Sequence, residues 1–280
     1  MSSKAVLLKE DGNRHFHSGD YVSAEALYSK AIIADPTNPS LYTNRAMARL
    51  KMNLWESAIA DCNECLKLSP DNMKAHYYLA QAHLELHDYY DAVEYALRAY
   101  DLCVKTADKS LSAATALVLR CKKERWEHQD KQRRRETRDL EDEVLAMMER
   151  ERDAALRGEE EEDVNALGDA GGARTEIEQE WERKMERMRT VFDKARAAEE
   201  KRRKVPDWAI DDISFGFMHD PVITKTGKSY ERSSIMEHLR RSNTDPLTRE
   251  PLYISELRPN LDLKQACDEF LQENGWAVDW

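Results

Sequence analysis

The fold is decided by DYVSAEALYSKAIIADP, residues 20–36, because this stretch returns 34 residues later as LWESAIADCNECLKLSP, residues 54–70. Small residues keep their places through three copies, at Ala24, Ala58 and Ala92. Small side chains at fixed positions let paired helices approach closely, and a regular period indicates that such pairs stack on one another. The pattern therefore predicts a mainly α fold that begins with three helical pairs over residues 5–106.

This pattern resembles the tetratricopeptide repeat, in which each unit is a helix–turn–helix. The resemblance implies a superhelix with a concave groove lined by the first helix of each unit. The last pair needs a capping helix with one apolar face. Residues spaced by three and four supply it: Leu111, Ala114, Leu117, Val118 and Cys121. We expect this helix to occupy residues 107–157 and to continue into a charged segment.

Composition excludes several classes of protein. The chain has 280 residues, of which 41% are hydrophobic, but no apolar run approaches the roughly 18 residues of a membrane helix. The net charge of −11 argues against a nucleic-acid partner, and five cysteines are an odd, sparse set for a disulfide scaffold. We therefore expect a soluble, cytoplasmic protein without a membrane or nucleic-acid partner.

About half of the charged residues lie between residues 121 and 204. Such a segment buries little apolar surface alone and is typical of an exposed helical spacer. Four glycines and the run EEEED predict a loop over residues 158–174, before a second helix over residues 175–204. The apolar stripe of this helix is Ile177, Trp181, Met185, Met188 and Phe192. It fits one helical hairpin or two paired hairpins, and we favour the coiled-coil homodimer.

Two basic runs flank this segment, RRR at residues 133–135 and KRRK at residues 201–204. Runs of this kind serve as nuclear-import signals or contact phosphate groups. The first role would place the protein in the nucleus as well as in the cytoplasm. Acidic neighbours surround both runs, so we favour a solvated helix face.

Four polar side chains fall on the groove-facing positions of the repeats: Lys9, Asn13, Asn44 and Lys74. Each alone is typical of a solvated surface, but together they predict an anion site, because their N–H groups donate strongly to carboxylates. They resemble the carboxylate clamp of repeat domains that bind chaperone tails. By this resemblance Lys9, Asn13 and Asn44 hold the terminal carboxylate of a Glu-Glu-Val-Asp tail, and Lys74 holds its last aspartate side chain.

Two details of the repeats bear on this site. Some clamps carry an arginine one turn after the second lysine, where this sequence has Tyr78, with Tyr77 beside it. Tyr77 either contacts an apolar residue of the tail or belongs to the core. Cys62 and Cys65 spell C-x-x-C but occupy small-residue positions of the repeat, so we interpret them as core. We expect no metal or cofactor.

The pattern changes after Val205. ISFGFM at residues 213–218 leads through DPVI to a turn at Gly227 and then SYE, which predicts a short hairpin in a small α+β domain. Ser234 and Glu237 fit a capping box that opens a helix.

The DPV motif, the DPLTR loop at residues 245–249 and the later PNL resemble the U-box of ubiquitin ligases across essentially all of residues 205–280. RING domains share this shape but need about eight Cys or His ligands for zinc. The segment offers only His219, His238 and Cys267. The resemblance therefore implies a RING-like domain that is held together without metal.

Together with the repeats and the spacer, this order of domains resembles chaperone-associated ubiquitin ligases. The resemblance implies an enzyme that forms no covalent ubiquitin intermediate and instead orients a ubiquitin-charged conjugating enzyme for attack. It places Ile213, Phe215 and Pro246 on the docking surface, although core packing is an alternative for the first two. It gives Arg249 the role of bridging conjugating enzyme and ubiquitin. Cys267 lies on an apolar stripe, so we interpret it as core and not as a nucleophile.

The same resemblance implies the remaining partners. They are heat-shock chaperones of the 70 and 90 kDa classes, bound by their C-terminal tails, ubiquitin, and misfolded clients destined for proteasomal degradation. A second hypothesis is a non-catalytic co-chaperone adaptor whose last domain only docks a partner. Ile213, Pro246 and Arg249 discriminate between the two, because an adaptor would not require them.

Overall fold

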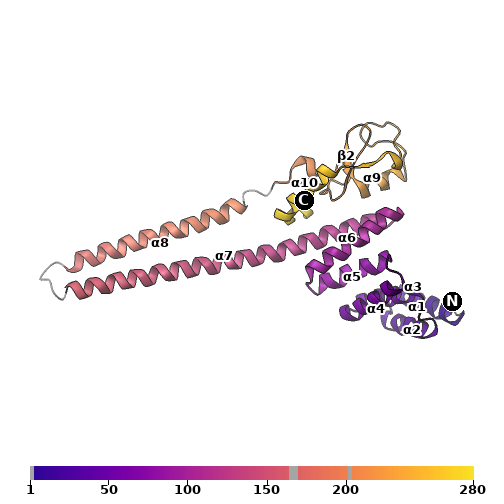
Figure 1. Cartoon of the computed structure of the whole chain (residues 1–280), viewed down its shortest axis with the longest axis horizontal. Helices are drawn as coiled ribbons and strands as arrows, with labels where there is room; N and C mark the ends of the chain where they lie inside the picture. The colour runs from indigo at the N-terminus through magenta and orange to yellow at the C-terminus, as the bar shows by residue number, and fades with distance from the viewer. Residues whose placement is uncertain (1–2, 164–169, 201–203) are drawn as a thin grey trace. The chain divides into compact units, whose positions relative to one another are not determined.

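The computed structural model describes residues 3–163, 170–200 and 204–280 (Figure 1). The chain divides into two compact units, one of Met1–Glu127 with Val205–Trp280 and the other of His128–Lys204. The fold is mainly α, as predicted, with a small antiparallel sheet near the C-terminus. None of the described helices combines the length and the apolar character that a membrane crossing would need.

The repeats consist of paired helices in the first unit. They are α1 (Ser3–His17), α2 (Tyr21–Ala34), α3 (Pro39–Lys51), α4 (Trp55–Leu68), α5 (Met73–Glu85) and α6 (Tyr89–Thr106). Side-chain oxygens of Asp20, Asn38 and Asn72 each accept a backbone N–H from the first turn of the helix that follows. Ala24, Ala58 and Ala92 have no exposed surface. The period of the sequence is therefore the period of helix packing.

The capping helix is the start of α7 (Leu111–Asp163). The predicted apolar stripe is buried, with Leu111, Ala114, Leu117, Val118 and Cys121 each at most 5% exposed. These residues share a core cluster with Ala96 and Tyr100 of α6. The last repeat thus closes its apolar face against α7.

The second unit is formed by the rest of α7 and by α8 (Ala170–Glu200), which lie side by side in Figure 1. Arg152 of α7 lies within electrostatic range of Glu178 of α8. The predicted loop over residues 158–174 is too long at both ends, because α7 continues to Asp163 and α8 begins at Ala170. Glutamate is a good helix former, so the acidic run prolongs α7. Residues 164–169 lie outside the described residues.

The C-terminal domain is organised around a sheet with the order β2-β1-β3. Its strands are β1 (Pro221–Ile223), β2 (Ser229–Glu231) and β3 (Arg258–Pro259), all antiparallel. The helices are α9 (Arg232–Leu239) and α10 (Leu261–Glu273), with 3-10 turns at Asp207–Ala209, Ile254–Glu256 and Gly275–Asp279. Val222, Tyr230 and Ile235 are fully buried and form the centre of one core.

The predicted capping box at Ser234 and Glu237 is wrong. Helix α9 begins at Arg232, and its N-cap is Glu231, the last residue of β2. A Glu231 carboxylate oxygen accepts the backbone N–H of Ser233 at 3.5 Å. Because strand and helix join without a loop, the cap comes from a strand residue, and Ser234 and Glu237 lie inside the helix.

Within the first unit, the C-terminal domain contacts α6 and the start of α7. Tyr100 Oη donates to Asp220 Oδ2 at 2.7 Å, and Trp126 Nε1 donates to the carbonyl oxygen of Glu273 at 3.0 Å. Gly275 lies so close to Trp126 that an added Cβ would stand 2.4 Å from the tryptophan Cβ. A glycine is therefore needed where the chain passes the indole.

Candidate functional site

Two predicted clamp residues lie together on neighbouring repeats. Asn44 Nδ2 on α3 donates to Asn13 Oδ1 on α1 at 3.1 Å, and Tyr28 Oη donates to the same oxygen at 2.8 Å. Burial raises the pKa of Tyr28 to about 12, so its hydroxyl stays protonated and remains a donor. Because the Asn13 oxygen already accepts two hydrogen bonds, its amide N–H groups are what it offers a ligand.

The two predicted lysines flank this pair on α1 and α5. Lys9 is half-buried one turn before Asn13, and Lys74 is exposed in the first turn of α5. Lys74 lies within electrostatic range of Asp108, whose pKa is lowered first by hydrogen bonds from Ser110 and further by this lysine. The four side chains thus come from the first helices of successive repeats, and their role as a clamp stays a prediction.

Beneath this face lies an ion-pair network that sequence reasoning missed. Arg45 and Arg49 of α3 contact the Asp61 carboxylate at 2.6 and 2.9 Å, and Arg49 also contacts Glu25 at 2.7 Å. Burial raises the pKa of Asp61, although both arginines oppose the shift. The network ties α3 to α2 and α4, and so holds Asn44, the neighbour of Arg45. The sequence indicates this network by charged residues at positions that the repeat period places on the inner faces of the helices.

The two tyrosines of α5 are half-buried. Tyr78 Oη donates to Met47 Sδ at 3.0 Å. The rings of Tyr77 and Tyr78 pack edge to face, with their centroids 6.0 Å apart. Tyr77 packs against the core cluster that contains Leu111. Part of Tyr77 therefore belongs to the core, and its contact with a ligand stays a prediction.

The cysteines belong to the core, as predicted. Cys62, Cys65 and Cys267 have no exposed surface. Burial raises the pKa of Cys65 to about 11 and that of Cys267 to about 12, so both thiols are protonated at neutral pH. A protonated, inaccessible thiol is a poor nucleophile and a poor metal ligand.

One group in the described residues has metal-ligand chemistry, namely His83, Asp88 and Asp91. His83 Nδ1 lies 3.1 Å from Asp88 Oδ2, and the same contact recurs at 3.1 Å between His15 and Asp20 in the first repeat. A contact that returns with the repeat belongs to the turn between paired helices. We therefore interpret it as structural.

The predicted docking residues lie on two loops of the C-terminal domain. Phe215 is 73% exposed, so core packing is excluded for it, whereas Ile213 is half-buried against the core around Val222. Pro246 is half-buried and Arg249 is exposed. Leu247, which sequence reasoning did not single out, is 66% exposed beside Pro246.

The first loop is a turn held by a buried aspartate, Asp211. One carboxylate oxygen of Asp211 accepts from Ser214 N at 2.8 Å and from Ser214 Oγ at 2.7 Å, and the other accepts from Glu231 N at 2.9 Å. The Asp211 carbonyl accepts from Phe215 N at 2.9 Å. Phe215 adopts a left-handed φ of 56°, which aims it out of the turn.

The second loop repeats this design around Asp245. Its carboxylate accepts from Leu247 N at 2.9 Å, from Thr248 N at 3.1 Å and from Tyr230 Oη at 3.0 Å. Its carbonyl accepts from Arg249 N at 2.9 Å, and Arg249 has a left-handed φ of 60°. Burial raises the pKa of Asp245, but the N–H donors outweigh it, and the net pKa is lowered. The turns share a strand, because Tyr230 and Glu231 are consecutive residues of β2.

Parts of this chain are similar to known protein families and to solved structures. Residues 205–276 match the U-box domain, and residues 43–104 match the tetratricopeptide repeat. The first TPR of Spaghetti (RPAP3), bound to HSP90 peptide SRMEEVD, is 33% identical, covering 41% of this chain and 93% of that chain with a TM-score of 0.37. The TPR2B-domain:pHsp70 complex of yeast Sti1 is 26% identical, covering 43% of this chain and 97% of that chain with a TM-score of 0.42.

A U-box whose loops are tied by aspartates, joined to tetratricopeptide repeats, defines the class: a repeat-containing U-box protein, and so a ubiquitin ligase. A full-length relative narrows this further. The E3 ubiquitin-protein ligase CHIP of Arabidopsis thaliana is 32% identical over 279 residues, which cover 99% of this chain and 96% of the relative. The chain therefore belongs to the CHIP family of E3 ubiquitin-protein ligases.

Proposed function

We propose that this ligase is chaperone-dependent. Its groove binds the C-terminal Glu-Glu-Val-Asp tail of heat-shock chaperones of the 70 and 90 kDa classes. Its U-box docks a ubiquitin-charged conjugating enzyme, and ubiquitin passes to lysines of a chaperone-bound misfolded client, which is then degraded by the proteasome. One observation carries the proposal: the same chain holds the paired amides of Asn13 and Asn44 and the exposed apolar surface of Phe215 and Leu247.

In the groove, the donors are arranged before a ligand arrives. The contacts among Tyr28, Asn13 and Asn44 fix two carboxamides, so little side-chain freedom is lost when a carboxylate binds. Each charge-assisted hydrogen bond to a carboxylate contributes about 1.5–3 kcal/mol. Lys9 and Lys74 supply the positive charge that the amides lack.

At the U-box, the chain contributes orientation and no nucleophile. Ile213, Phe215 and Pro246 form the apolar docking surface, which the exposed Leu247 extends. The exposed Arg249 guanidinium bridges conjugating enzyme and ubiquitin by hydrogen bonds. The buried, protonated Cys267 agrees with a mechanism in which ubiquitin leaves the conjugating enzyme directly. Holding the thioester in an attack-ready geometry accelerates transfer by removing orientational freedom.

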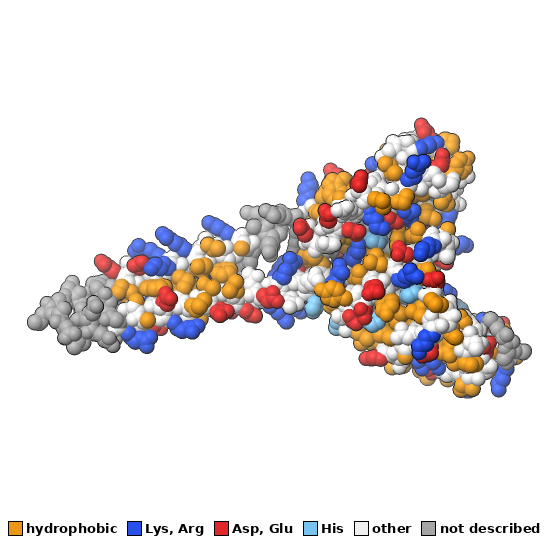
Figure 2. Space-filling view, in the orientation of Figure 1, with side chains coloured by type: hydrophobic (Ala, Val, Ile, Leu, Met, Phe, Trp, Pro, Cys, Tyr) orange, Lys and Arg blue, Asp and Glu red, His pale blue; other side chains and the backbone are white. Residues whose placement is uncertain are grey.

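We also propose that two copies pair through the α7–α8 unit as a coiled-coil homodimer. Large apolar side chains of this unit remain exposed, with Leu140 at 52%, Met147 at 47% and Val191 at 61%. In Figure 2 hydrophobic side chains run along this unit among charged ones of both signs. A second copy would cover this surface. A cytoplasmic location, with nuclear import through the basic runs, stays a prediction.

The alternative is a non-catalytic co-chaperone adaptor. A reconstituted reaction with activating enzyme, conjugating enzymes, ubiquitin and ATP tests it, with a chaperone-bound client as substrate. We expect ubiquitin chains on the client. The double variant Lys9→Ala, Asn44→Ala should lose client modification and tail binding but keep self-ubiquitination, while Lys51→Ala, an exposed residue at the end of α3, serves as control.

Each half of the proposal can fail separately. If no ubiquitin chains form with any conjugating enzyme tested, the result would favour the adaptor hypothesis. Unchanged tail affinity in the double variant would show that the groove residues are not the clamp. Client modification that persists in the double variant would mean that the ligase does not depend on the chaperone tail.

A further inference from the structure

The groove-facing row of the repeats continues onto α7. Ser112 is the second residue of α7, as the predicted clamp residue Lys74 is the second residue of α5. The step between them is longer than 34 residues, because α6 has 18 residues whereas α4 has 14. Ser112 is exposed, whereas Leu111 beside it is buried in the core cluster between α6 and α7. The first turn of α7 therefore adds a fourth helix to the wall that carries the clamp residues.

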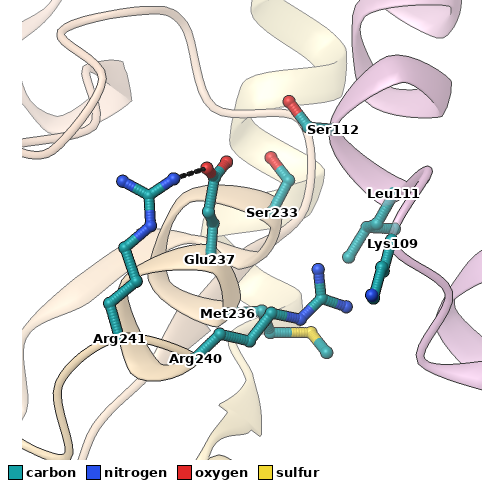
Figure 3. Close-up of a pocket in the computed structure, with 8 residues that line it drawn as sticks. All are labelled: Lys109, Leu111, Ser112, Ser233, Met236, Glu237, Arg240 and Arg241. Atoms are coloured by element: carbon teal, nitrogen blue, oxygen red, sulfur yellow. Dashed lines mark hydrogen bonds and ion pairs between the residues drawn. The ribbon is translucent and has the colours of Figure 1, made fainter.

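At this end of the row a pocket of about 300 Å³ lies between the start of α7 and α9 (Figure 3). One wall is formed by Lys109, Leu111 and Ser112, and the other by Ser233, Met236, Glu237, Arg240 and Arg241. Leu111 and Met236 belong to one buried apolar cluster, so the two walls are packed together at this point. The pocket is thus part of the contact between the repeats and the U-box.

The lining of the pocket is positively charged, although the whole chain has a net charge of −11. Arg241 is paired with Glu237 at 2.8 Å, which neutralises both. Figure 3 shows the Arg240 guanidinium reaching toward Lys109. In the described parts of the chain, Lys109 makes no ion pair, so it and Arg240 leave an excess of positive charge.

Arg240 is held in place by the loop between α6 and α7. Its Nη2 donates to the backbone oxygens of Ala107 and Asp108 at 3.1 and 3.2 Å. The Asp108 carboxylate accepts the backbone N–H of Ser110 at 2.7 Å and lies within electrostatic range of both Arg240 and Lys74. Asp108 therefore links the predicted clamp lysine electrostatically to the pocket.

We propose that this pocket continues the tail-binding groove and takes an acidic side chain that precedes the gripped C-terminus, with Lys109 and Arg240 as its cationic contacts. The proposal rests on the proposed function of the groove. Packed helices lie about 8–10 Å apart, and an extended chain spans about 3.3–3.6 Å per residue. An acidic residue four or five positions before the last residue can therefore span the step from α5 to α7.

Two synthetic peptides test this on the full chain, Asp-Asp-Glu-Glu-Val-Asp and Asn-Asn-Glu-Glu-Val-Asp. The two peptides share the Glu-Glu-Val-Asp tail and differ only in the negative charge of the two residues before it, which the pocket would bind. Calorimetry should show the aspartate peptide binding about tenfold more tightly to the wild type. This ratio should fall toward one in Lys109→Gln and in Lys109→Gln, Arg240→Gln, and remain near tenfold in Lys51→Gln. The single variant leaves the Arg240 contact with the α6–α7 loop intact.

The outcomes separate this inference from the function on which it rests. Binding of neither peptide would overturn the tail-binding groove, and the pocket with it. Equal affinity of the two peptides for the wild type would overturn the pocket alone. An advantage of the aspartate peptide that survives in both pocket variants would show that the acidic residues are read elsewhere in the groove.

Discussion

The turns at residues 211–216 and 245–250 share one backbone design and present different chemistry. In each, a buried aspartate accepts a backbone N–H three residues later through its side chain and another four residues later through its carbonyl. In each, the fifth residue has a left-handed φ, yet it is Phe215 in the first turn and Arg249 in the second. The backbone of the turn is therefore the same in both loops, and we call it the frame. The side chain at its fifth position differs between them.

The frame has a measurable cost. A left-handed backbone at a residue with a side chain costs about 1–2 kcal/mol, because Cβ crowds the following carbonyl oxygen. The hydrogen bonds to Asp211 and Asp245 offset that cost. Two carboxylates and the shared strand β2 tie these two loops together.

The largest predicted effect comes from removing either aspartate. Asp211→Ala and Asp245→Ala each leave several donors unpaired around a buried site, and we expect each to lower the unfolding free energy of the domain by about 4 kcal/mol. Hydrogen exchange of amides within residues 205–280, followed by mass spectrometry, measures this loss.

The matched control for these variants lies in the first turn. Asp212 is exposed, and among the described residues its one ion pair is with Lys228 at the surface. Asp212→Ala should change the same quantity by less than about 1 kcal/mol, because surface ion pairs contribute little. Equal losses for Asp211→Ala and Asp212→Ala would contradict the idea of a frame built on the buried carboxylate.

The next prediction separates the side chains that the frames present. Phe215→Ala should weaken binding of the conjugating enzyme at least tenfold, because a large exposed aromatic is typical of an interface anchor. Arg249→Ala should instead slow ubiquitin discharge at saturating conjugating enzyme, since its guanidinium acts on the charged complex. Single-turnover discharge assays with titrated conjugating enzyme distinguish affinity from rate, and Thr248→Ala can serve as the neighbouring control.

Arg249→Lys sharpens this test. Lysine keeps the charge but lacks the planar set of donors, so it should recover little of the rate if hydrogen bonds to two partners matter. Full recovery would show that Arg249 acts through charge alone. A shift of affinity and no change of rate in Arg249→Ala would contradict the division of roles between the two turns.

The sequence alone predicted the repeats well, because their packing depends on small residues at a fixed period, such as Ala24 and Ala58. It could not predict the start of α9, where Glu231 ends a strand and caps a helix at once. Leu247 was overlooked because the similarity of DDISF and DPLTR becomes evident only when both aspartates are seen to fold the same turn. The Arg45–Asp61 pair was missed because a search for apolar residues at the repeat period passes over charged residues at the same inward-facing positions.

The smallest predicted effect tests the strand that the turns share. Tyr230→Phe removes the hydroxyl that donates to Asp245 but leaves the backbone donors of Leu247 and Thr248. We therefore expect the unfolding free energy to fall by about 1.5 kcal/mol at pH 7. The lowered pKa of Asp245 fixes the sign of the pH dependence. The ionised Asp245 carboxylate contributes fully to stability above its pKa in the unfolded chain, about 3.9. That contribution is lost as the pH falls through the lower pKa of the folded state.

The difference in unfolding free energy between Tyr230→Phe and wild type should therefore narrow only below about pH 3.9, as the folded Asp245 carboxylate takes up a proton through its lowered pKa. Thermal unfolding midpoints measured from pH 7 down to pH 3 follow it, with Tyr253→Phe, a 54% exposed tyrosine of the same domain, as control. A difference that stays constant with pH would mean that Tyr230 acts through packing alone. In that case only the first turn would gain stability from a hydrogen bond to β2, the one from Glu231 N to Asp211.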